Sequence, residues 1–275
     1  MKAIRISERG GPEVLQIQEV ADPAPGPSDV VVEVKATAIN RADLLQCLGM
    51  YPAPPGVPAD IPGLEYAGVV SSIGSKVTRW RAGDRIMGIV GGGAFAQKLV
   101  AHEREAVPIP PGMTLTDAAA LPEAFFTAFD ALVLQGALRS GERVLIHAVG
   151  SGVGTAAAQI AAAIGAQVLG TSRSPAKLER AKQLGLSHPI VADPAAPHFA
   201  PKVKEATGGS GVDVALDLVG GDYLAETLAS LGSGARVLLV GLMGGAAATI
   251  ELRVLLAKRI RLIGTVLRKI GRAHV

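Results

Sequence analysis

The sequence contains only one cysteine, Cys47, among its 275 residues. One thiol can form neither an internal disulfide nor a thiolate metal cluster, and its scarcity agrees with a reducing compartment. The chain also lacks any uninterrupted apolar run near the roughly 20 residues that cross a bilayer. Its opening stretch, 1–6, has the pattern of a β-strand and not of a signal peptide. These absences predict a cytoplasmic protein that does not span a membrane.

Aromatic residues are scarce as well, at 3% of the chain, although the sequence pI is about 9.1 and the net charge is +3. Proteins that bind single-stranded nucleic acids combine clustered cations with aromatic surfaces on which bases stack. Here the basic residues are scattered, and two of them, Lys269 and Arg272, fall in the last stretch of the chain. We therefore expect no nucleic-acid partner.

Hydrophobic residues, by contrast, make up 49% of the chain, which is enough for two domains with sizeable cores. The first part, to about residue 121, is rich in short β patterns separated by glycine and proline turns. It predicts strands at 2–6, 14–20, 29–39, 66–73, 84–90 and 95–100. Between the third and fourth of these we expect a short helix over 40–48, with Asn40 as its N-cap, followed by a proline-rich loop.

From residue 111 the pattern becomes helical, and a longer amphipathic helix is predicted over 122–139. Beyond it, strands and helices alternate. The predicted strands are 143–148, 166–171, 188–191, 213–217, 234–240 and 261–267, and the predicted helices are 152–164, 175–184, 200–206, 222–231 and 252–257. Six strands in this alternation indicate an α/β fold with a doubly wound parallel sheet.

A glycine-rich turn lies at the start of this alternation. The apolar strand 143–148 leads into Gly150, Gly152 and Gly154, and an alanine-rich stretch follows. Glycines at a strand-to-helix turn let backbone amides approach a pyrophosphate, which the helix N-terminus also attracts. Glycine at a helix entry is a weak signal by itself, because α/β proteins of other functions carry it too. Together with the strand that follows, it predicts a bound nicotinamide dinucleotide.

That second strand, 166–171, ends without the Asp or Glu that an NAD site uses to bind the ribose hydroxyls. Hydroxyls and cations stand there instead, namely Ser172, Arg173, Ser174 and Lys177. Such groups can hold an additional 2′-phosphate through charge-assisted hydrogen bonds, so NADPH is favoured over NADH. The alternative interpretation is a solvated turn that leads into a helix with Pro175 at its first position.

A series of short motifs runs through the chain. They are Gly10-Gly-Pro-Glu13, Asn40-Arg-Ala-Asp43, Gly63-Leu-Glu65, Leu121-Pro-Glu123 with Thr127-Ala-Phe129, Val144–Gln159, Asp217-Leu-Val-Gly-Gly221 and Gly241-Leu-Met-Gly-Gly245. In this order, over residues 1 to about 268, they resemble the zinc-independent quinone oxidoreductases of the medium-chain dehydrogenase/reductase superfamily, and most of all their tumour-suppressor-induced branch. The resemblance implies a GroES-like substrate domain at 1–121 and an NADPH-binding Rossmann domain at 122–268.

The resemblance implies an enzyme that transfers hydride from NADPH to a quinone. Zinc-dependent relatives carry a cysteine where Asn40 stands and a histidine where Leu64 stands, and the histidines of this chain share no metal-ligand spacing, so no metal site is expected. Glu65, which zinc-dependent relatives also carry, is expected to be structural or to support a neighbouring side chain, and not to bind a metal. An enal or enoyl reductase on the same scaffold is the alternative enzyme. A non-enzymatic NADPH-binding or RNA-associating protein is the alternative from another class.

The resemblance also implies where ligands bind. Near a quinone or α,β-unsaturated carbonyl we expect Asn40 as an amide donor and Tyr51 as a pocket wall or phenolic donor, although a helix cap and loop packing explain these two residues equally well. The expected coenzyme residues are Gly150, Ser151, Gly152, Val153 and Gly154 at the pyrophosphate, Ser172, Arg173, Ser174 and Lys177 at the 2′-phosphate, and Thr127, Val219, Gly220, Gly241, Leu242 and Met243 at the nicotinamide half. Ala192 replaces an aromatic residue near the adenine, so stacking there is expected to be lost.

The C-terminal end departs from the family. Relatives continue beyond the sixth strand with a segment that returns to the first domain, so the resemblance implies a truncated chain. The final stretch, 269–275, matches the translation of a common sequencing adapter, and we expect it to be read-through. In relatives the sixth strand pairs across a dimer interface, which implies a homodimer through 261–267.

Overall fold

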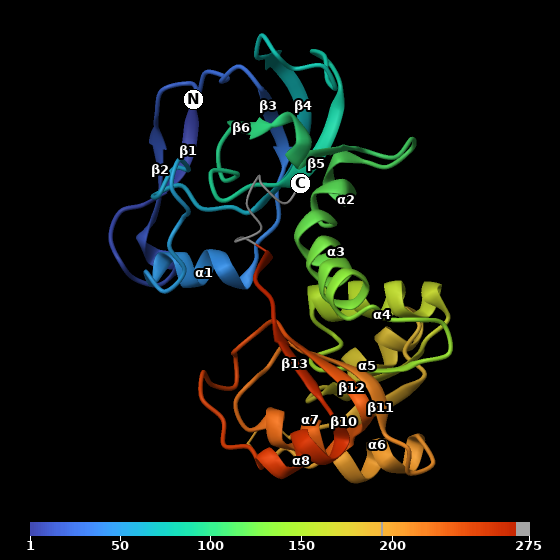
Figure 1. Ribbon diagram of the computed structural model, residues 1–275. Helices are drawn as coiled ribbons and strands as arrows, with labels where there is room; N and C mark the ends of the chain where they lie inside the picture. The colour runs from blue at the N-terminus through green and yellow to red at the C-terminus, as the bar shows by residue number, and fades with distance from the viewer. Residues whose placement is uncertain (194, 268–275) are drawn as a thin grey trace. The chain divides into compact units, whose positions relative to one another are not determined.

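The computed structural model describes residues 1–193 and 195–267. The chain divides into two compact units, Met1–Glu123 and Ala124–Leu267, which are drawn in Figure 1. The boundary between them falls within helix α3 (Pro122–Phe129). The expected read-through stretch, 269–275, lies outside the described residues. Within these residues, no helix combines the length and the apolar character needed to cross a membrane.

The first unit contains a two-stranded and a five-stranded sheet, the latter in the order β6-β3-β4-β5-β7. Its strands, all paired antiparallel, are β1 (Lys2–Ile6), β2 (Leu15–Glu19), β3 (Asp29–Ala36), β4 (Glu65–Ile73), β5 (Arg85–Ile89), β6 (Lys98–His102) and β7 (Ala106–Pro108). Because alternate residues of a strand share a face, Val30 and Val32 enter the same core as Tyr66 and Ile86.

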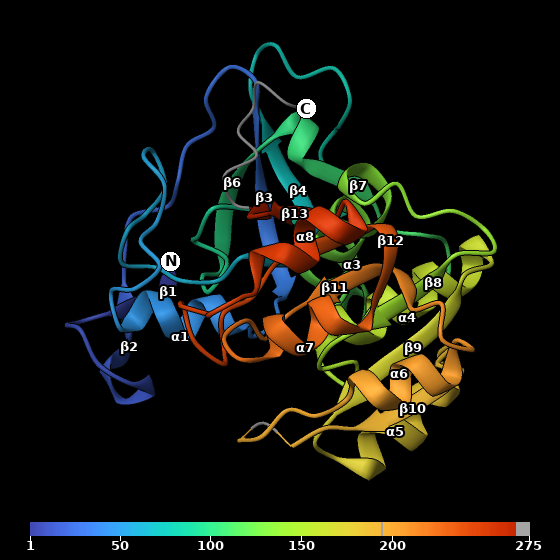
Figure 2. The same cartoon turned by 60° about the horizontal axis from the view of Figure 1, so that its bottom comes forward.

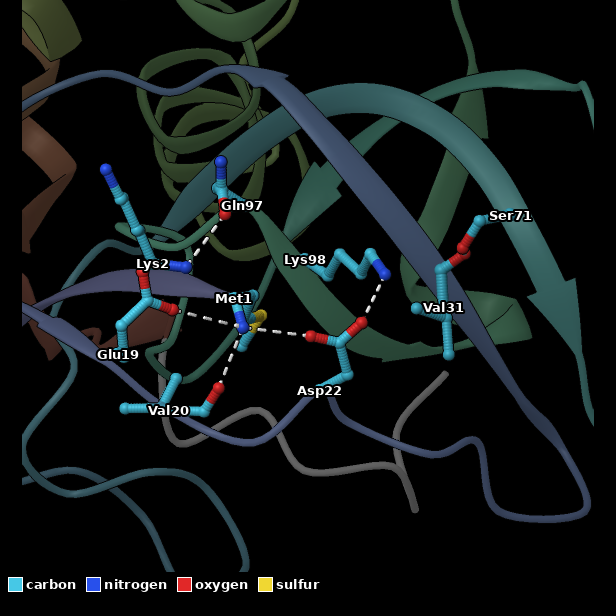
Figure 3. A network of polar contacts seen from close by, with 9 residues as sticks. All are labelled: Met1, Lys2, Glu19, Val20, Asp22, Val31, Ser71, Gln97 and Lys98. Atoms are coloured by element: carbon cyan, nitrogen blue, oxygen red, sulfur yellow. Dashed lines mark hydrogen bonds and ion pairs between the residues drawn. The ribbon is translucent and has the colours of Figure 1, made fainter.

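Charged groups tie the N-terminal strand pair to β6 (Figure 3). The α-amino group of Met1 donates to the carbonyl of Val20 at 2.8 Å and forms an ion pair with Asp22 at 3.0 Å. The Asp22 carboxylate also accepts a hydrogen bond from Lys98 of β6, and the hydrogen bonds from Lys98 and Met1 lower the pKa of this carboxyl. Because Asp22 and Lys98 remain in contact with solvent, their ion pair contributes little to stability.

The helices of the first unit are short. They are α1 (Arg41–Cys47), α2 (Leu115–Ala119) and the 3₁₀ helices η1 (Pro12–Val14) and η2 (Glu103–Glu105). The predicted helix after the third strand is confirmed as α1, and Asn40 occupies its N-cap position. Helix α2 is capped by Thr114 and packs Ala118 and Ala119 against Ala67 of β4 and Met87 of β5.

The second unit is built on a six-stranded parallel sheet in the order β10-β9-β8-β11-β12-β13. Its strands are β8 (Arg143–Ile146), β9 (Gln167–Ser172), β10 (His188–Val191), β11 (Val212–Asp217), β12 (Leu231–Leu239) and β13 (Arg261–Gly264). The helices α4 (Gly152–Ile164), α5 (Pro175–Lys182), α6 (Ala200–Ala206), α7 (Tyr223–Ser230) and α8 (Leu252–Lys258) lie between them along the chain (Figure 2). The strand order reverses between β8 and β11, so the predicted doubly wound Rossmann sheet is confirmed.

Successive residues of β8 enter two different cores. Val144 and Ile146 pack with side chains of α4 and α5, whereas Leu145 packs with side chains of α6 and α7. Helices therefore cover both faces of the sheet, and all three residues are completely buried. This explains why the strands have continuous apolar runs rather than an alternation of apolar and polar residues.

The prediction of one helix over 122–139 was wrong. Helix α3 ends at Phe129, and the chain continues as a π-helix, η3 (Asp130–Gln135), before it leaves the helical path. Gln135 Nε2 donates to Asp130 Oδ2 at 2.6 Å across the wide turn. At its end, the carbonyl of Gly136 accepts a hydrogen bond at 2.8 Å from the buried Arg236 of β12. The break therefore depends on a strand that lies far along the chain.

Some strand limits also differ from the predicted ones. Strand β3 stops at Ala36 instead of residue 39, because the Thr37 hydroxyl donates to the Glu65 carbonyl at 2.6 Å and the chain turns toward α1. Strand β12 begins at Leu231 instead of residue 234, since Leu231 still pairs with Val212 of β11. Strand β6 is shifted toward the C-terminus relative to the predicted 95–100, strand β13 ends before residue 267, and strand β7 was not predicted.

Candidate functional site

The glycine-rich turn joins β8 to α4 at the carboxyl edge of the sheet. Ser151 is the N-cap of α4, and its Oγ accepts a hydrogen bond from the N–H of Gly154 at 3.1 Å. The first turn of a helix contains N–H groups with no helical partner, here including those of Gly152 and Val153. Together with the positive end of the helix dipole, such groups can hold a phosphate.

Two of the three glycines leave no room for a side chain. A Cβ added to Gly154 would lie 2.5 Å from the carbonyl oxygen of Ala148, because the helix packs directly on the turn. A Cβ added to Gly150 would lie 2.7 Å from Cβ of Lys177. At the exposed Gly152, the nearest neighbour of an added Cβ is 4.0 Å away. The space in front of the helix N-terminus is therefore open to a ligand.

The turn after β9 presents hydroxyls and cations. Ser172 Oγ accepts the N–H of Ser174 at 3.1 Å, and Ser174 Oγ accepts the N–H of Lys177 at 3.4 Å as the N-cap of α5. Each hydroxyl keeps its own proton to donate to a ligand. The Arg173 and Lys177 side chains are exposed, and neither forms an ion pair with any other residue that the structure describes. This turn therefore keeps both positive charges for a ligand.

The loops after β11 and β12 are bound to each other. The N–H of Gly244 donates to the carbonyl of Val219 at 2.7 Å, and Gly220 pairs with Gly245 in an isolated parallel bridge. A Cβ added to Gly241 would lie 2.5 Å from the carbonyl of Leu218. The two loops, 218–221 and 241–245, thus form one unit at the same edge of the sheet as the glycine-rich turn.

Asp217, at the end of β11, holds the first of these loops and was not among the expected site residues. Its Oδ1 accepts the N–H groups of Val219 and Gly220, both at 2.8 Å. Its main-chain oxygen accepts the N–H of Val240, also at 2.8 Å, so Asp217 holds the start of both loops. The other carboxylate oxygen, Oδ2, is buried without a hydrogen-bond partner among the described residues. An Asp shortly before a glycine pair, at the end of an apolar strand, is the sequence signal for such a turn.

Thr127 and two apolar side chains complete the edge. Thr127 lies on α3, and its Oγ1 is buried without a hydrogen-bond partner in the described part of the chain. Buried hydroxyls are nearly always paired in proteins, so this hydroxyl is free to form a hydrogen bond with a polar group of a ligand. Helix α3 packs in the same core as Ala148 and Leu218. Leu242 and Met243 are 53% and 56% exposed, which is unusual for large apolar residues and suits contact with a planar ring.

Asn40 is held at both its main chain and its side chain. It forms a capping box with Asp43, whose Oδ2 accepts the Asn40 N–H at 2.7 Å. The Asn40 side-chain Nδ2 donates to Glu65 Oε1, also at 2.7 Å. Glu65 is 2% exposed, and its Oε2 accepts the N–H of Glu123 at 2.9 Å. Burial raises the pKa of Glu65, although the hydrogen bonds from Asn40 and Glu123 oppose this.

Tyr51 lies at the other end of α1. It is half-buried in the loop that follows this helix, and its N–H donates to the carbonyl of Leu45 at 3.2 Å. Asn40 and the loop that carries Tyr51 thus follow opposite ends of a seven-residue helix about 10 Å long. Leu64 is buried in the same unit. Within the described residues, no group of three or more His, Cys, Asp or Glu is arranged to hold a metal ion.

His147 follows β8 and is completely buried. Its ring nitrogens Nδ1 and Nε2 lie 2.9 and 2.8 Å from the hydroxyls of Thr171 and Thr227. The ring packs against Phe199 and, edge-on, against Tyr223. Burial lowers the pKa of His147 to about 4, so the ring is neutral near pH 7. His147 is therefore a packed core residue.

The sheet brings most of the expected coenzyme residues together. Strands β9, β8, β11 and β12 are neighbours, and the residues in question follow their carboxyl ends. They are Gly150, Ser151, Gly152, Val153, Gly154, Ser172, Arg173, Ser174, Lys177, Val219, Gly220, Gly241, Leu242 and Met243. In doubly wound folds, ligands bind outside the carboxyl ends of the strands, where the strand order reverses. Asn40, Tyr51 and Glu65 belong to the first unit.

Comparison with known proteins agrees with this organisation. Residues 26–111 match the family described as the alcohol dehydrogenase GroES-like domain, and residues 152–274 match the zinc-binding dehydrogenase family. A quinone oxidoreductase from Rattus norvegicus is 36% identical over 270 residues, which are 96% of this chain and 79% of the relative.

Two solved structures extend the comparison. Escherichia coli quinone oxidoreductase complexed with NADPH superposes with a TM-score of 0.87 at 31% identity, over 98% of this chain and 82% of that one. The enoyl reductase CurK superposes with a TM-score of 0.85 at 30% identity, over 98% of this chain and 81% of that one. The predicted pair of a GroES-like unit and a Rossmann unit is thus confirmed, and the chain belongs to the quinone oxidoreductases of the medium-chain dehydrogenase/reductase superfamily.

Proposed function

We propose that this protein transfers hydride from NADPH to a quinone without zinc. The choice of NADPH as the coenzyme rests on the turn after β9. Arg173 and Lys177 are exposed there beside the hydroxyls of Ser172 and Ser174, and the turn contains no Asp or Glu for the ribose hydroxyls that NADH would present. Similarity to quinone oxidoreductases, one of them solved with NADPH, supports the acceptor class and the coenzyme.

The second unit has suitable groups for each part of this coenzyme, which would supply the hydride. The first turn of α4 offers free N–H groups to the pyrophosphate, and the open space at Gly152 admits it. Arg173 and Lys177 neutralise the 2′-phosphate. Thr127 offers its unpaired hydroxyl to the nicotinamide half. The linked loops 218–221 and 241–245, with Leu242 and Met243, form the wall on which the ring is oriented.

The first unit is proposed to bind the acceptor. A quinone accepts hydride without a Lewis acid, because the incoming charge spreads onto its oxygens, so the protein needs only to orient it and to stabilise that charge. Asn40 Nδ2 carries two N–H donors, and Glu65 uses one of them. The other is available to an acceptor oxygen. Tyr51 forms a wall or a phenolic donor, and Leu64 supplies no ligand atom for zinc.

The proposal is tested by following NADPH oxidation with a panel of para- and ortho-quinones, with and without a metal chelator. We expect turnover that survives the chelator and a preference for NADPH over NADH. Loss of turnover in the chelator, with recovery on adding zinc, would contradict the metal-free mechanism. Titration calorimetry that detects no binding of NADPH would contradict the coenzyme assignment itself.

A second candidate is an NADPH-dependent enal or enoyl reductase, which the similarity to the enoyl reductase CurK favours. Its substrates, α,β-unsaturated carbonyls, also accept hydride with the charge delocalised onto oxygen. The same coenzyme site and the same Asn40 donor would serve both reactions. Adding a 2-alkenal and an enoyl thioester to the acceptor panel separates the two, since the preferred acceptor has the higher kcat/KM.

We also propose a cytoplasmic homodimer that forms through β13. This strand is an edge of the six-stranded sheet. Leu262 and Val266, on and just after it, are 43% and 45% exposed, although large apolar side chains of this kind are usually buried. An unpaired edge strand can pair with the same strand of a second copy. Light scattering should give the mass of a dimer, and Leu262→Lys should convert it to a monomer. A monomer without this substitution would contradict the proposal.

A further inference from the structure

The Asn40 amide is oriented by a single side-chain partner. Its Nδ2 donates to Glu65 Oε1, and its capping box with Asp43 places the side chain toward the N–H groups at the start of α1. An amide turned by 180° would direct its oxygen at Glu65 and its NH₂ group at those N–H groups. The observed arrangement instead leaves one N–H of Nδ2 without a partner within the described residues.

The carboxylate of Glu65 is the physical cause of this orientation of the Asn40 amide. Its two oxygens accept hydrogen bonds from Asn40 Nδ2 at 2.7 Å and from the backbone N–H of Glu123 at 2.9 Å. An ionised carboxylate accepts hydrogen bonds and cannot donate them, so only the nitrogen of Asn40 can face it. Because Glu65 is only 2% exposed, water does not reach it to replace a lost partner. Removal of either donor would therefore leave a buried carboxylate oxygen without its hydrogen bond.

We propose that Glu65 is a positioning residue, which fixes the Asn40 amide so that its remaining N–H points to the oxygen of the bound acceptor. This inference rests on the proposed role of Asn40 as a donor to the acceptor. It gives Glu65 a specific partner and a function in turnover, whereas the sequence left both a structural and a supporting role open. The functional unit is then a pair of residues at the start of α1 and of β4, separated by 25 positions in the chain.

Glu65→Gln is the informative substitution because it preserves shape and changes only the hydrogen-bond pattern. The backbone N–H of Glu123 cannot turn, so the side-chain oxygen of the introduced glutamine must accept it, and the glutamine NH₂ group must face Asn40. Asn40 then has to present its oxygen to that NH₂ group. In the flipped amide the Asn40 NH₂ group faces the N–H groups at the start of α1, which is a contact between donors. The amide then no longer offers the same N–H to the acceptor.

The same reasoning predicts a distinctive pH profile. A protonated Glu65 presents one donor and one acceptor, as a glutamine does. Burial favours this protonated form, and so does the negative charge of nearby Asp43, whereas the hydrogen bonds from Asn40 and from Glu123 of α3 favour the ionised form. Quinone reduction should therefore decrease in acid as Glu65 takes up a proton. Glu65→Gln should lack this acid limb and remain at the low level throughout.

The experiment compares Glu65→Gln, Asn40→Ala and the double variant by steady-state quinone reduction and by NADPH titration. We expect each single variant to lower kcat/KM for the quinone roughly tenfold, the usual loss for one hydrogen bond to a developing charge, with an unchanged Kd for NADPH. The double variant should be no slower than Asn40→Ala, because Glu65 acts only through Asn40. Thr37→Val, which removes a hydrogen bond to the main chain of Glu65 and leaves its carboxylate intact, is the matched control and should retain activity.

The outcomes separate this inference from the proposed function. If Asn40→Ala lowers kcat/KM but Glu65→Gln does not, or if the two losses multiply in the double variant, Glu65 does not position Asn40. If Asn40→Ala itself has no effect, the proposed donor role of Asn40 is wrong. If Glu65→Gln loses activity together with its NADPH affinity and its cooperative thermal transition, the residue is structural, and the inference is overturned.

Discussion

The side chain of Lys177 lies against Gly150, so closely that a Cβ added to the glycine would come within 2.7 Å of Lys177 Cβ and 3.0 Å of its Cδ. The contact joins the turn after β8 to the helix after β9. The aliphatic stem of the lysine is thereby held by packing, while its ammonium group is free of ion pairs with other described residues. A cation is thus kept beside the glycine-rich turn, between the proposed sites for the pyrophosphate and the 2′-phosphate.

Removal of the two cations should abolish the preference for NADPH. In Arg173→Ala with Lys177→Ala, each lost charge-assisted hydrogen bond to the 2′-phosphate should raise the KM for NADPH roughly tenfold or more, while the KM for NADH stays constant. Both constants come from initial rates with one quinone. Lys182→Ala, at the end of the same helix and paired with Glu179, removes a positive charge away from the proposed 2′-phosphate site and serves as the control. An unchanged ratio of the two constants would refute the assignment.

Two neighbouring glycines should respond differently to alanine. At Gly154 the new Cβ would meet the carbonyl oxygen of Ala148 at 2.5 Å and Cα of Val149 at 2.7 Å, and backbone atoms cannot move aside easily. We expect Gly154→Ala to lower the free energy of unfolding by about 1–3 kcal/mol. Gly152→Ala should change stability by less than about 1 kcal/mol but weaken NADPH binding, since its Cβ enters the space kept for the pyrophosphate. Urea unfolding and NADPH titration distinguish the two. Equal stability of both variants would contradict this packing.

His147 should make stability depend on pH in mild acid. Its pKa is lowered from 6.5 to about 4 in the folded protein, so the unfolded chain binds a proton at a higher pH than the folded one. Its contribution is fully present above pH 6.5, falls as the pH decreases, and is lost by about pH 4, in total roughly 3 kcal/mol. In His147→Gln this part of the dependence should disappear. Urea unfolding at about pH 7 and about pH 4.5 measures it, with the exposed His198→Gln as control. An identical slope in wild type and His147→Gln would argue against a buried neutral imidazole.

Asp217 should affect coenzyme binding through the loops that it holds. Asp217→Ala leaves the N–H groups of Val219 and Gly220 without their acceptor, which costs about 1–3 kcal/mol for each donor that stays buried. The linked loops 218–221 and 241–245 should then shift together and weaken NADPH binding. Asp217→Asn keeps a carbonyl oxygen for the same N–H groups and should lose less on both measures. Calorimetric titration with NADPH reports the affinity, and a full affinity in Asp217→Ala would show that the loops do not need this anchor.

Several elements of the proposed coenzyme site could be predicted from the sequence because their signals are local. A β-branched and aliphatic run, a glycine triplet and an alanine-rich stretch specify a strand, a turn and a helix within residues 143–165, and Ser151 and Ser174 stand at the N-caps where the structure has them. The absence of an Asp or Glu directly after β9 is likewise evident from the sequence. The ends of β3 and β12 were missed, because contacts with a neighbouring strand, and not residue preference, set them.

The sequence by itself determined the alternation of strands and helices after residue 143 and the residue types at the glycine-rich turn, because periodicity and turn chemistry act over a few neighbouring residues. Only the tertiary structure decided which distant groups meet. It turned the Asn40 amide toward Glu65, left one oxygen of Asp217 unpaired among the described residues, and ended the helical path after η3 by means of Arg236, 100 positions away. Such contacts depend on the packing of whole elements, and no local pattern in the chain encodes them.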